Sequence, residues 1–119
     1  FYNKNKKKIK IFWSSKKNKW KITEIRKIFK NKNVYITFDV DGFDSSLMPA
    51  TGTPEPGGMF WDDVIPIIKN VCSVSNVVGA DINELAPIKK FNSCNFLAAK
   101  LAYKIISYAF EFKKKYSNR

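Results

Sequence analysis

An apolar run that ends in acidic residues constrains this chain more than any other feature. Residues 34–38 are all β-branched or aromatic, and Asn33 and Gly42 bound the segment on either side. Such a run predicts a strand over residues 34–39 that is buried on both faces. Asp39 and Asp41 then follow at its carboxyl end.

The two aspartates are a candidate cation site. Side chains alternate along an extended chain, so Asp39 and Asp41 are expected to point the same way. Their charges repel each other unless a cation lies between them, and hard divalent ions prefer carboxylate oxygen. Ligands also bind at the carboxyl ends of strands in parallel α/β sheets. The alternative is a turn in which the aspartates hydrogen-bond their own backbone.

Two other kinds of site also use such a pair of aspartates, and the residues that follow Asp39 test each of them. An EF-hand loop counted from Asp39 would need glycine at position 44 and glutamate at position 50, where the chain has Asp44 and Ala50, so a calcium loop is excluded. The segment also resembles the first motif of haloacid dehalogenase phosphatases, with Asp39 as nucleophile and Asp41 as acid/base. Phe43 stands where that family usually has threonine, and this phosphatase reading is kept as an alternative.

A longer resemblance is to the arginase/agmatinase ureohydrolases. Their signature Ser-x-Asp-x-Asp-x-x-Asp-Pro, continued by Thr-Gly-Thr-Pro-x-Pro-Gly-Gly, is similar to residues 37–58, and a second signature, Gly-x-Asp-x-x-Glu-x-x-Pro, is similar to residues 79–87. Two motifs in the right order are more specific than either alone. The wording of both is closer to agmatinase than to arginase.

The resemblance implies a fold, a reaction and residue roles. The fold is α/β, a three-layer arginase-like parallel sheet with flanking helices, of which this chain holds the C-terminal portion. The reaction is hydrolysis of a guanidino compound, most simply agmatine to putrescine and urea, with two Mn²⁺ ions. Asp39 would bridge both ions, Asp41 would bind one, and Glu84 would hold the substrate guanidinium. Asp81 would be an inward-facing structural carboxylate that supports the ligands.

Several departures from the family pattern stand out. Thr37 replaces the usual serine, Ser45 replaces a proline, and the chain contains no histidine. The family's upstream histidine motifs are therefore missing, and too few ligands are present to hold two ions. We expect residues 9–119 to be a fragment of a ureohydrolase domain that is inactive alone, and the full-length form to be a cytoplasmic homo-oligomer.

The basic residues gather at one end of the chain. Residues 1–32 contain thirteen lysines and arginines against Glu24 alone, whereas the remainder holds nine charges of each sign. A non-catalytic module that binds an anionic partner is thus a third hypothesis. Only Arg26 and Arg119 are arginine, which favours a solvated face over nucleic-acid binding. We expect residues 1–8 to be mobile, and no apolar run is long enough for a membrane span.

The remaining pattern predicts two further strands and three helices. Cys72 and Cys94 lie too far apart to suggest a zinc motif or a disulfide framework. The expected elements are a strand at 9–13, a helix capped by Thr23 and carrying Ile25, Ile28 and Phe29, a loop at 42–58, a helix over 64–71 capped by Asp62 or Asp63 with Pro66 in its first turn, a strand over 77–85, and a helix over 96–112 capped by Asn92 or Ser93.

Overall fold

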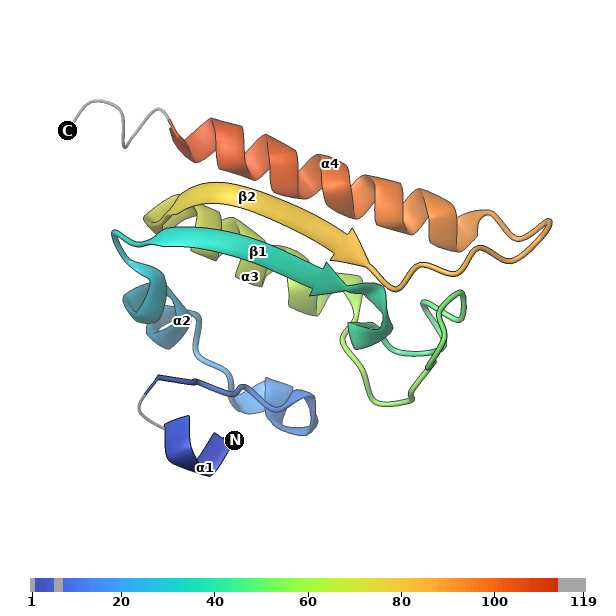
Figure 1. The fold of residues 1–119 in the computed structure, drawn as a ribbon, viewed down its shortest axis with the longest axis horizontal. Helices are drawn as coiled ribbons and strands as arrows, with labels where there is room; N and C mark the ends of the chain where they lie inside the picture. The colour runs from blue at the N-terminus through green and yellow to red at the C-terminus, as the bar shows by residue number, and fades with distance from the viewer. Residues whose placement is uncertain (1, 6–7, 114–119) are drawn as a thin grey trace.

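Two parallel strands form the centre of the molecule. The computed structural model describes residues 2–5 and 8–113. In chain order the elements are α1 (Tyr2–Asn5), η1 (Ser14–Lys19), α2 (Ile22–Phe29), β1 (Asn33–Asp39), η2 (Val40–Gly42), α3 (Trp61–Val74), β2 (Asn76–Asn83) and α4 (Ser93–Lys113). Within these ranges β1 pairs only with β2, and α3 connects them, as expected for a strand-helix-strand unit (Figure 1).

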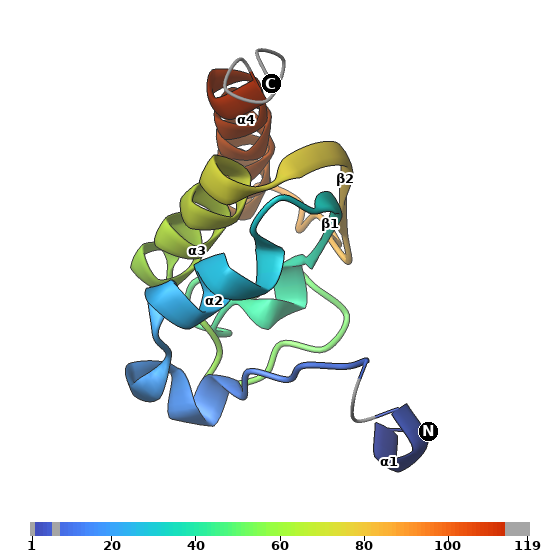
Figure 2. The ribbon, with the colours of Figure 1, turned by 90° about the vertical axis from the view of Figure 1, so that its left-hand side faces the viewer.

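The described helices that pack on the sheet lie on one side of it. Figure 2 shows α2, α3 and α4 on the same side of the two strands. Along β1, exposed and half-buried residues alternate, with Ile36 and Phe38 facing the helices and Tyr35 and Thr37 facing outward. The prediction that this strand is buried on both faces is therefore wrong for the described chain, because no described helix covers the second face.

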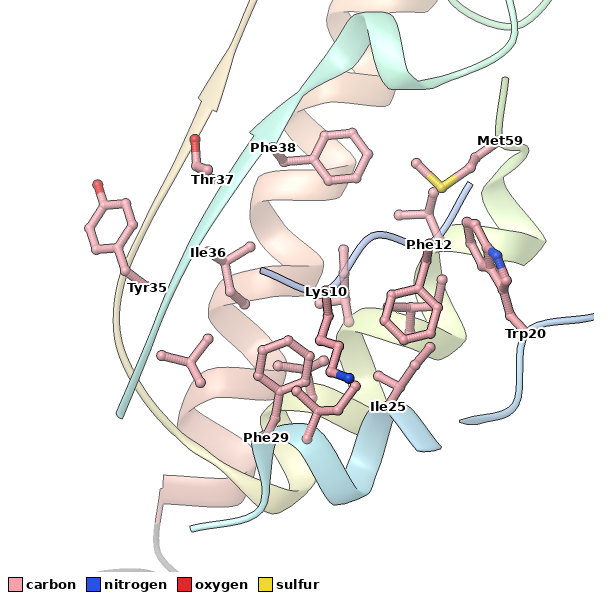
Figure 3. Close-up of a pocket in the computed structure, with 16 residues that line it drawn as sticks. Lys10, Phe12, Trp20, Ile25, Phe29, Tyr35, Ile36, Thr37, Phe38 and Met59 are labelled. Atoms are coloured by element: carbon pink, nitrogen blue, oxygen red, sulfur yellow. The ribbon is translucent and has the colours of Figure 1, made fainter. Parts of the chain in front are cut away.

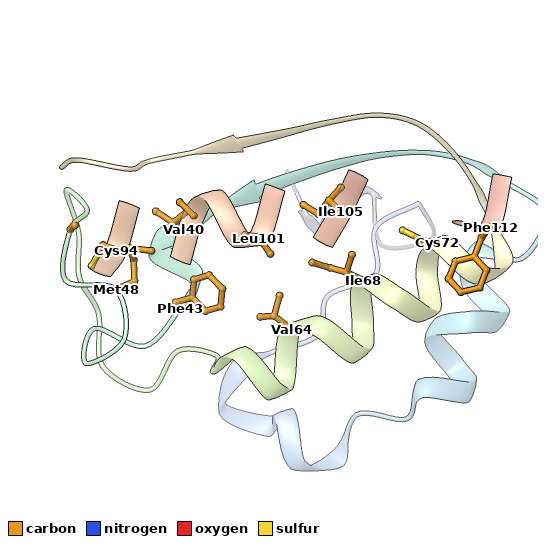
Figure 4. Close-up of a cluster of buried hydrophobic side chains, with 12 residues drawn as sticks. Val40, Phe43, Met48, Val64, Ile68, Cys72, Cys94, Leu101, Ile105 and Phe112 are labelled. Atoms are coloured by element: carbon orange, nitrogen blue, oxygen red, sulfur yellow. The ribbon is translucent and has the colours of Figure 1, made fainter. Parts of the chain in front are cut away.

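The hydrophobic core fills the space between the strands, α3 and α4. Figure 4 shows side chains from both helices meeting those of the loop that follows β1. The largest fully buried members are Val40, Phe43, Met48, Val64, Cys72, Cys94 and Leu101. Removing a buried leucine side chain generally costs about 2–5 kcal/mol, so this cluster fixes the helices against the sheet. The two cysteines are buried free thiols.

Helix α3 begins earlier than its apolar stripe suggests. Its first residue is Trp61, and the Asp63 carboxylate accepts a hydrogen bond from the Phe60 backbone N–H at 2.8 Å. The prediction that Asp62 or Asp63 precedes the helix as its cap is therefore wrong, because Phe60 holds that position and Asp63 bonds to it from the third position of the helix. Pro66 lies in the second turn instead of the first, and the helix continues through it.

The final helix matches the predicted stripe. Helix α4 begins at Ser93, three residues before the expected start, and the Phe96 N–H donates to the Asn92 carbonyl. Leu101, Ile105 and Phe112 are buried, as the spacing of threes and fours requires. The stripe thus holds α4 against the sheet and α3.

Two predictions near the amino terminus are wrong. Residues 9–13 have no regular secondary structure and pair with no described strand, and Phe12 instead packs edge-on against Trp20 with ring centroids 6.2 Å apart. Phe12 is thus packed against an aromatic ring, which a local pattern cannot distinguish from strand pairing, whereas Ile11 and Trp13 remain exposed. Helix α2 begins at Ile22 after Lys21, so Thr23 is not its cap.

Two further predictions concern membrane-spanning helices and the amino-terminal segment. None of the helices in the described ranges has the length and apolarity that crossing a bilayer demands. The expected mobile segment 1–8 includes residues 6 and 7, which, like residue 1, lie outside the described residues.

Candidate functional site

The carboxyl ends of the two strands lead directly into the three predicted carboxylates. We call this end of the sheet, with Asp39, Asp41 and Glu84, the carboxylate edge. Asp39 is the last residue of β1 and lies opposite Asn83, the last residue of β2. Because the strands are parallel, Asp41 and Glu84 both follow from this edge, where the two strand arrows end in Figure 1. The register therefore brings the three sequence-predicted residues to one end of the sheet.

Asp39 and Asp41 are not on one continuous strand. The chain turns into η2 directly after Asp39, so strand alternation cannot place the Asp41 side chain. Val40, between them, is fully buried, whereas Asp39 is exposed and Asp41 is half-buried. A core-facing anchor thus fixes the backbone between two carboxylates that remain accessible.

Little in the described chain compensates these two charges. The Thr53 hydroxyl donates to Asp41 Oδ2 at 3.1 Å, and the Asp39 carboxylate has no hydrogen-bond or ion-pair partner among the described residues. Free carboxylate oxygens are suited to a hard divalent cation. However, the described residues contain no group of three acidic, histidine or cysteine side chains that could hold a metal, so the chain's own set fits only part of a metal site.

Asp44 belongs to the loop and not to the cation site. Its carboxylate accepts hydrogen bonds from the Ser46 hydroxyl, from the Ser46 N–H at 2.9 Å and from the Gly57 N–H at 2.8 Å. These donors, Ser46 first, lower the pKa of Asp44. The turn-forming role considered as the alternative for these aspartates thus applies to Asp44.

A close backbone approach explains the glycine pair of this loop. Gly57 has φ +82°, and a Cβ at Gly58 would lie 2.5 Å from the Asp44 backbone nitrogen. The Lys17 amine donates to the Gly58 carbonyl at 3.1 Å, which ties the amino-terminal segment to the loop. Lys17 also pairs with Asp63 at 2.7 Å, and this bond lowers the pKa of Asp63. Sequence reasoning missed Lys17, since no local pattern marks it among so many lysines.

Glu84 has an unusual backbone. Its φ is +67°, in the left-handed region that side-chain-bearing residues seldom occupy, and it is exposed. The segment after it is held by the Ala86 N–H, which donates to the Ala50 carbonyl at 2.9 Å. Such a conformation in a residue without a stabilising partner in the described chain is typical of functional sites.

Asp81 organises the outer face of the sheet behind Asp39. It accepts hydrogen bonds from the Thr37 hydroxyl at 2.6 Å, the Tyr35 hydroxyl at 2.9 Å and the Asn83 amide at 2.6 Å. These hydrogen bonds lower the pKa of Asp81, and the bond from Thr37 has the largest effect. The hydrogen bond between Tyr35 and Asp81 also raises the pKa of Tyr35. The expectation that Asp81 faces inward is wrong, because its strand register places it beside Thr37 on the uncovered face.

The structure also has an apolar pocket, called the apolar hollow below, that lies apart from the three carboxylates. It has a volume of about 410 Å³ and lies between β1, α2 and α3, with Phe12, Trp20 and Met59 among its lining residues. In Figure 3 the side chains of Tyr35 and Thr37 point away from it. Asp39, Asp41 and Glu84 do not line it, so this hollow is separate from the carboxylate edge.

Comparison with known families gives one family match over most of the chain. The model of the Arginase family matches residues 2–107. An N(1)-aminopropylagmatine ureohydrolase of Synechocystis is 37% identical over 112 residues, which covers 92% of this chain and 36% of that protein. An agmatinase of Chromobacterium violaceum is 46% identical over 66 residues, which covers 56% of this chain and 20% of that protein.

Solved structures give the same fold. The agmatine ureohydrolase of Thermoplasma volcanium is 32% identical, with a TM-score of 0.76 over 93% of this chain and 38% of that structure. Proclavaminate amidino hydrolase of Streptomyces clavuligerus has a TM-score of 0.78 at 19% identity and therefore supports the fold alone. The described chain thus has an arginase-like α/β fold, and it spans about a third or less of the length of the curated relatives named here.

Proposed function

The chain belongs to the arginase family, and from this premise we propose that it carries three carboxylates of a ureohydrolase site. Asp39 and Asp41 would be metal ligands, and Glu84 would bind the substrate guanidinium. The observation that carries the proposal is the strand register, in which Glu84 directly follows the residue opposite Asp39.

The metal in this proposal is manganese, and its remaining ligands would come from polypeptide outside residues 1–119. When bound, it supplies Lewis-acid activation of water near neutral pH. Asp39 and Asp41 suit it because they are accessible and carry hard oxygen ligands, while Asp81 fixes Thr37 and Asn83 beside them. The part of the chain that the structure describes supplies no complete site, so activity of residues 1–119 alone is not expected.

The substrate in this proposal is a guanidino amine. A guanidinium carries parallel N–H groups that a carboxylate can accept in pairs, and Glu84 offers an exposed carboxylate with no competing partner in the described chain. The two relatives reported above are named for agmatine and for its aminopropyl derivative, which supports a substrate of this class. The orientation that such a pair imposes would place the guanidinium carbon toward the metal edge.

A graft tests this proposal. Residues 1–119 would replace the matching 36% of the Synechocystis ureohydrolase, and both urea release and manganese content would be measured. We expect Asp39→Asn and Asp41→Asn to lose manganese together with urea release. Glu84→Gln should keep manganese but lower kcat/KM for agmatine or its aminopropyl derivative by about 100-fold or more, because only one side of the paired hydrogen bond remains.

The control for the graft is Glu111→Gln, which changes an exposed glutamate on the last turns of α4, at the other end of the sheet from the carboxylate edge (Figure 1). It should leave manganese and urea release unchanged. Full manganese content and activity in the Asp39→Asn graft would contradict the proposal. Release of phosphate from a generic ester, abolished by Asp39→Asn, would instead support the phosphatase alternative.

A further inference from the structure

The loop after β1 contacts the segments that follow both strands. The Thr53 hydroxyl donates to Asp41 Oδ2 at 3.1 Å, and the Ala50 carbonyl accepts the Ala86 N–H at 2.9 Å. Ala86 lies two residues after Glu84. Figure 1 shows this loop, drawn in green, beside the segment that follows β2. One short stretch of loop therefore holds the Asp41 side chain and, through a separate bond, the backbone that carries Glu84.

Thr53 is exposed, but its backbone is held on both sides. Ala50, three residues before it, is 1% exposed and belongs to the core. Two residues after it, the Glu55 carbonyl accepts the Ser45 N–H at 3.1 Å. Pro54 lies between them, and a proline ring confines the residue before it to extended conformations. The loop thus fixes the place from which the Thr53 hydroxyl donates.

The Asp41 carboxylate depends on this one bond. Among residues 2–5 and 8–113, Thr53 is the only hydrogen-bond partner of the Asp41 side chain. The neighbouring Val40 is fully buried and fixes the backbone, so the carboxylate moves mainly by rotation about its side-chain bonds. A hydrogen bond to Oδ2 restricts that rotation. Oδ1 and a second lone pair of Oδ2 remain available to a cation.

We propose that Thr53 is a positioning residue that orients the Asp41 carboxylate for the metal. This inference rests on the function proposed above, which gives Asp41 a cation to bind. Thr53 does not contact the metal itself, because its hydroxyl donates to the carboxylate. Its effect is to hold Asp41 in one rotamer before the cation arrives. A ligand that is already oriented binds more tightly, since less freedom is lost on binding.

The expected effect is modest and confined to the metal. The bond length of 3.1 Å is at the long end of the range for a hydroxyl donor. Loss of a bond of this kind should raise the Mn²⁺ dissociation constant by about three- to tenfold. The bond between Ala50 and Ala86 does not involve the Thr53 side chain. The KM for the guanidino substrate at saturating Mn²⁺ should therefore change by less than about twofold.

Nuclear magnetic resonance of the metal-free chain tests the orientation directly. Three-bond couplings about the Cα–Cβ bond of Asp41 should report one rotamer in the unchanged chain and in Thr53→Ser, which keeps the hydroxyl. Thr53→Val is nearly isosteric but lacks the hydroxyl, so its couplings should be averaged over several rotamers. Averaged couplings in the unchanged chain, or a single rotamer in Thr53→Val, would overturn the proposal.

The matched control is Thr51→Val, which makes the same change two residues earlier in the same loop. The Thr51 hydroxyl is buried and has no hydrogen-bond partner in the described chain. Its removal should leave the Asp41 couplings as they are in the unchanged chain. Averaging in Thr51→Val equal to that in Thr53→Val would mean that any disturbance of the loop frees Asp41, and the assigned role of the Thr53 hydroxyl would be wrong.

Manganese affinity of the graft separates this inference from the function on which it rests. Equilibrium dialysis should show a dissociation constant raised by about three- to tenfold in Thr53→Val and changed by less than about twofold in Thr53→Ser and Thr51→Val. An unchanged affinity in Asp41→Asn would contradict the proposed function itself. Weaker binding in Asp41→Asn together with unchanged binding in Thr53→Val would leave that function standing and would overturn the positioning role alone.

Discussion

At the scale of single residues, the carboxylates divide by their partners. Asp44 and Asp81 each accept three hydrogen bonds from within the chain, whereas Asp39 and Glu84 have no partner among the described residues. The sequence distinguishes these roles poorly, because all four are acidic residues near strand ends. The position of Asp39 at the end of a strand predicted a cation site, whereas only the motif resemblance predicted the role of Glu84, and both roles remain proposals.

The backbone of Glu84 leads to a stability prediction. A left-handed conformation costs a residue with a side chain roughly 1–2 kcal/mol, and glycine avoids this cost but gains freedom in the unfolded chain. Glu84→Gly should therefore raise the free energy of unfolding by roughly 0.5–1 kcal/mol, measured by urea denaturation. Glu55→Gly, at an exposed glutamate outside the left-handed region, should not. Equal effects of the two variants would remove the argument that Glu84 is strained.

The Asp63 carboxylate leads to a pH prediction. It caps α3 and pairs with Lys17, so Asp63→Asn should lower the free energy of unfolding by about 1 kcal/mol at neutral pH. Because the folded-state pKa is lowered, this stabilisation is present above the unfolded pKa near 4 and disappears as the pH falls through the folded pKa. Denaturation of Asp63→Asn and Asp62→Asn at several pH values checks this. A difference that persists below the folded pKa would contradict it.

At the scale of elements, strong periodicity was predictive and weak periodicity was not. The strand at 34–39 and the stripe of α4 were predicted because their apolar residues recur regularly against a buried partner. The prediction of a strand at residues 9–13 was wrong because a five-residue segment is too short to show a clear periodicity. The environment of this segment also depends on Trp20, which lies outside it. Pairing of Thr37 with Asp81 also depends on register, which local sequence does not specify.

The loop after β1 gives an element-scale prediction. Gly58→Ala would push a methyl group to 2.5 Å from the Asp44 and Phe43 backbone, which cannot yield as a flexible side chain can. We expect a loss of roughly 1–3 kcal/mol in the free energy of unfolding, typical of overpacking. Gly52→Ala has open space around its new methyl group and a negative φ, so it should be nearly neutral. Equal stability of the two variants would show that the loop does not require the close approach.

At the scale of the whole molecule, the uncovered face of the sheet explains two differences from expectation, the burial of β1 on one face only and the outward position of Asp81. The family resemblance predicted a three-layer fold, and the described residues form the sheet and one helical layer of it. Burial of the second face needs polypeptide that no pattern within residues 1–119 could supply. The described residues also contain no group of three acidic, histidine or cysteine side chains that could hold a metal. The oligomeric state and cytoplasmic location of the full-length form stay predictions.

The most direct test of the account is Mn²⁺ titration of the isotope-labelled chain, followed by nuclear magnetic resonance. Paramagnetic Mn²⁺ broadens the signals of nearby groups even when it binds weakly. We predict selective broadening at Asp39, Asp41 and Glu84, lost in Asp39→Asn, with Glu111 on the last turns of α4 unaffected. Broadening at Asp39 without Glu84, or equal broadening at Glu111, would contradict a shared site at this edge of the sheet.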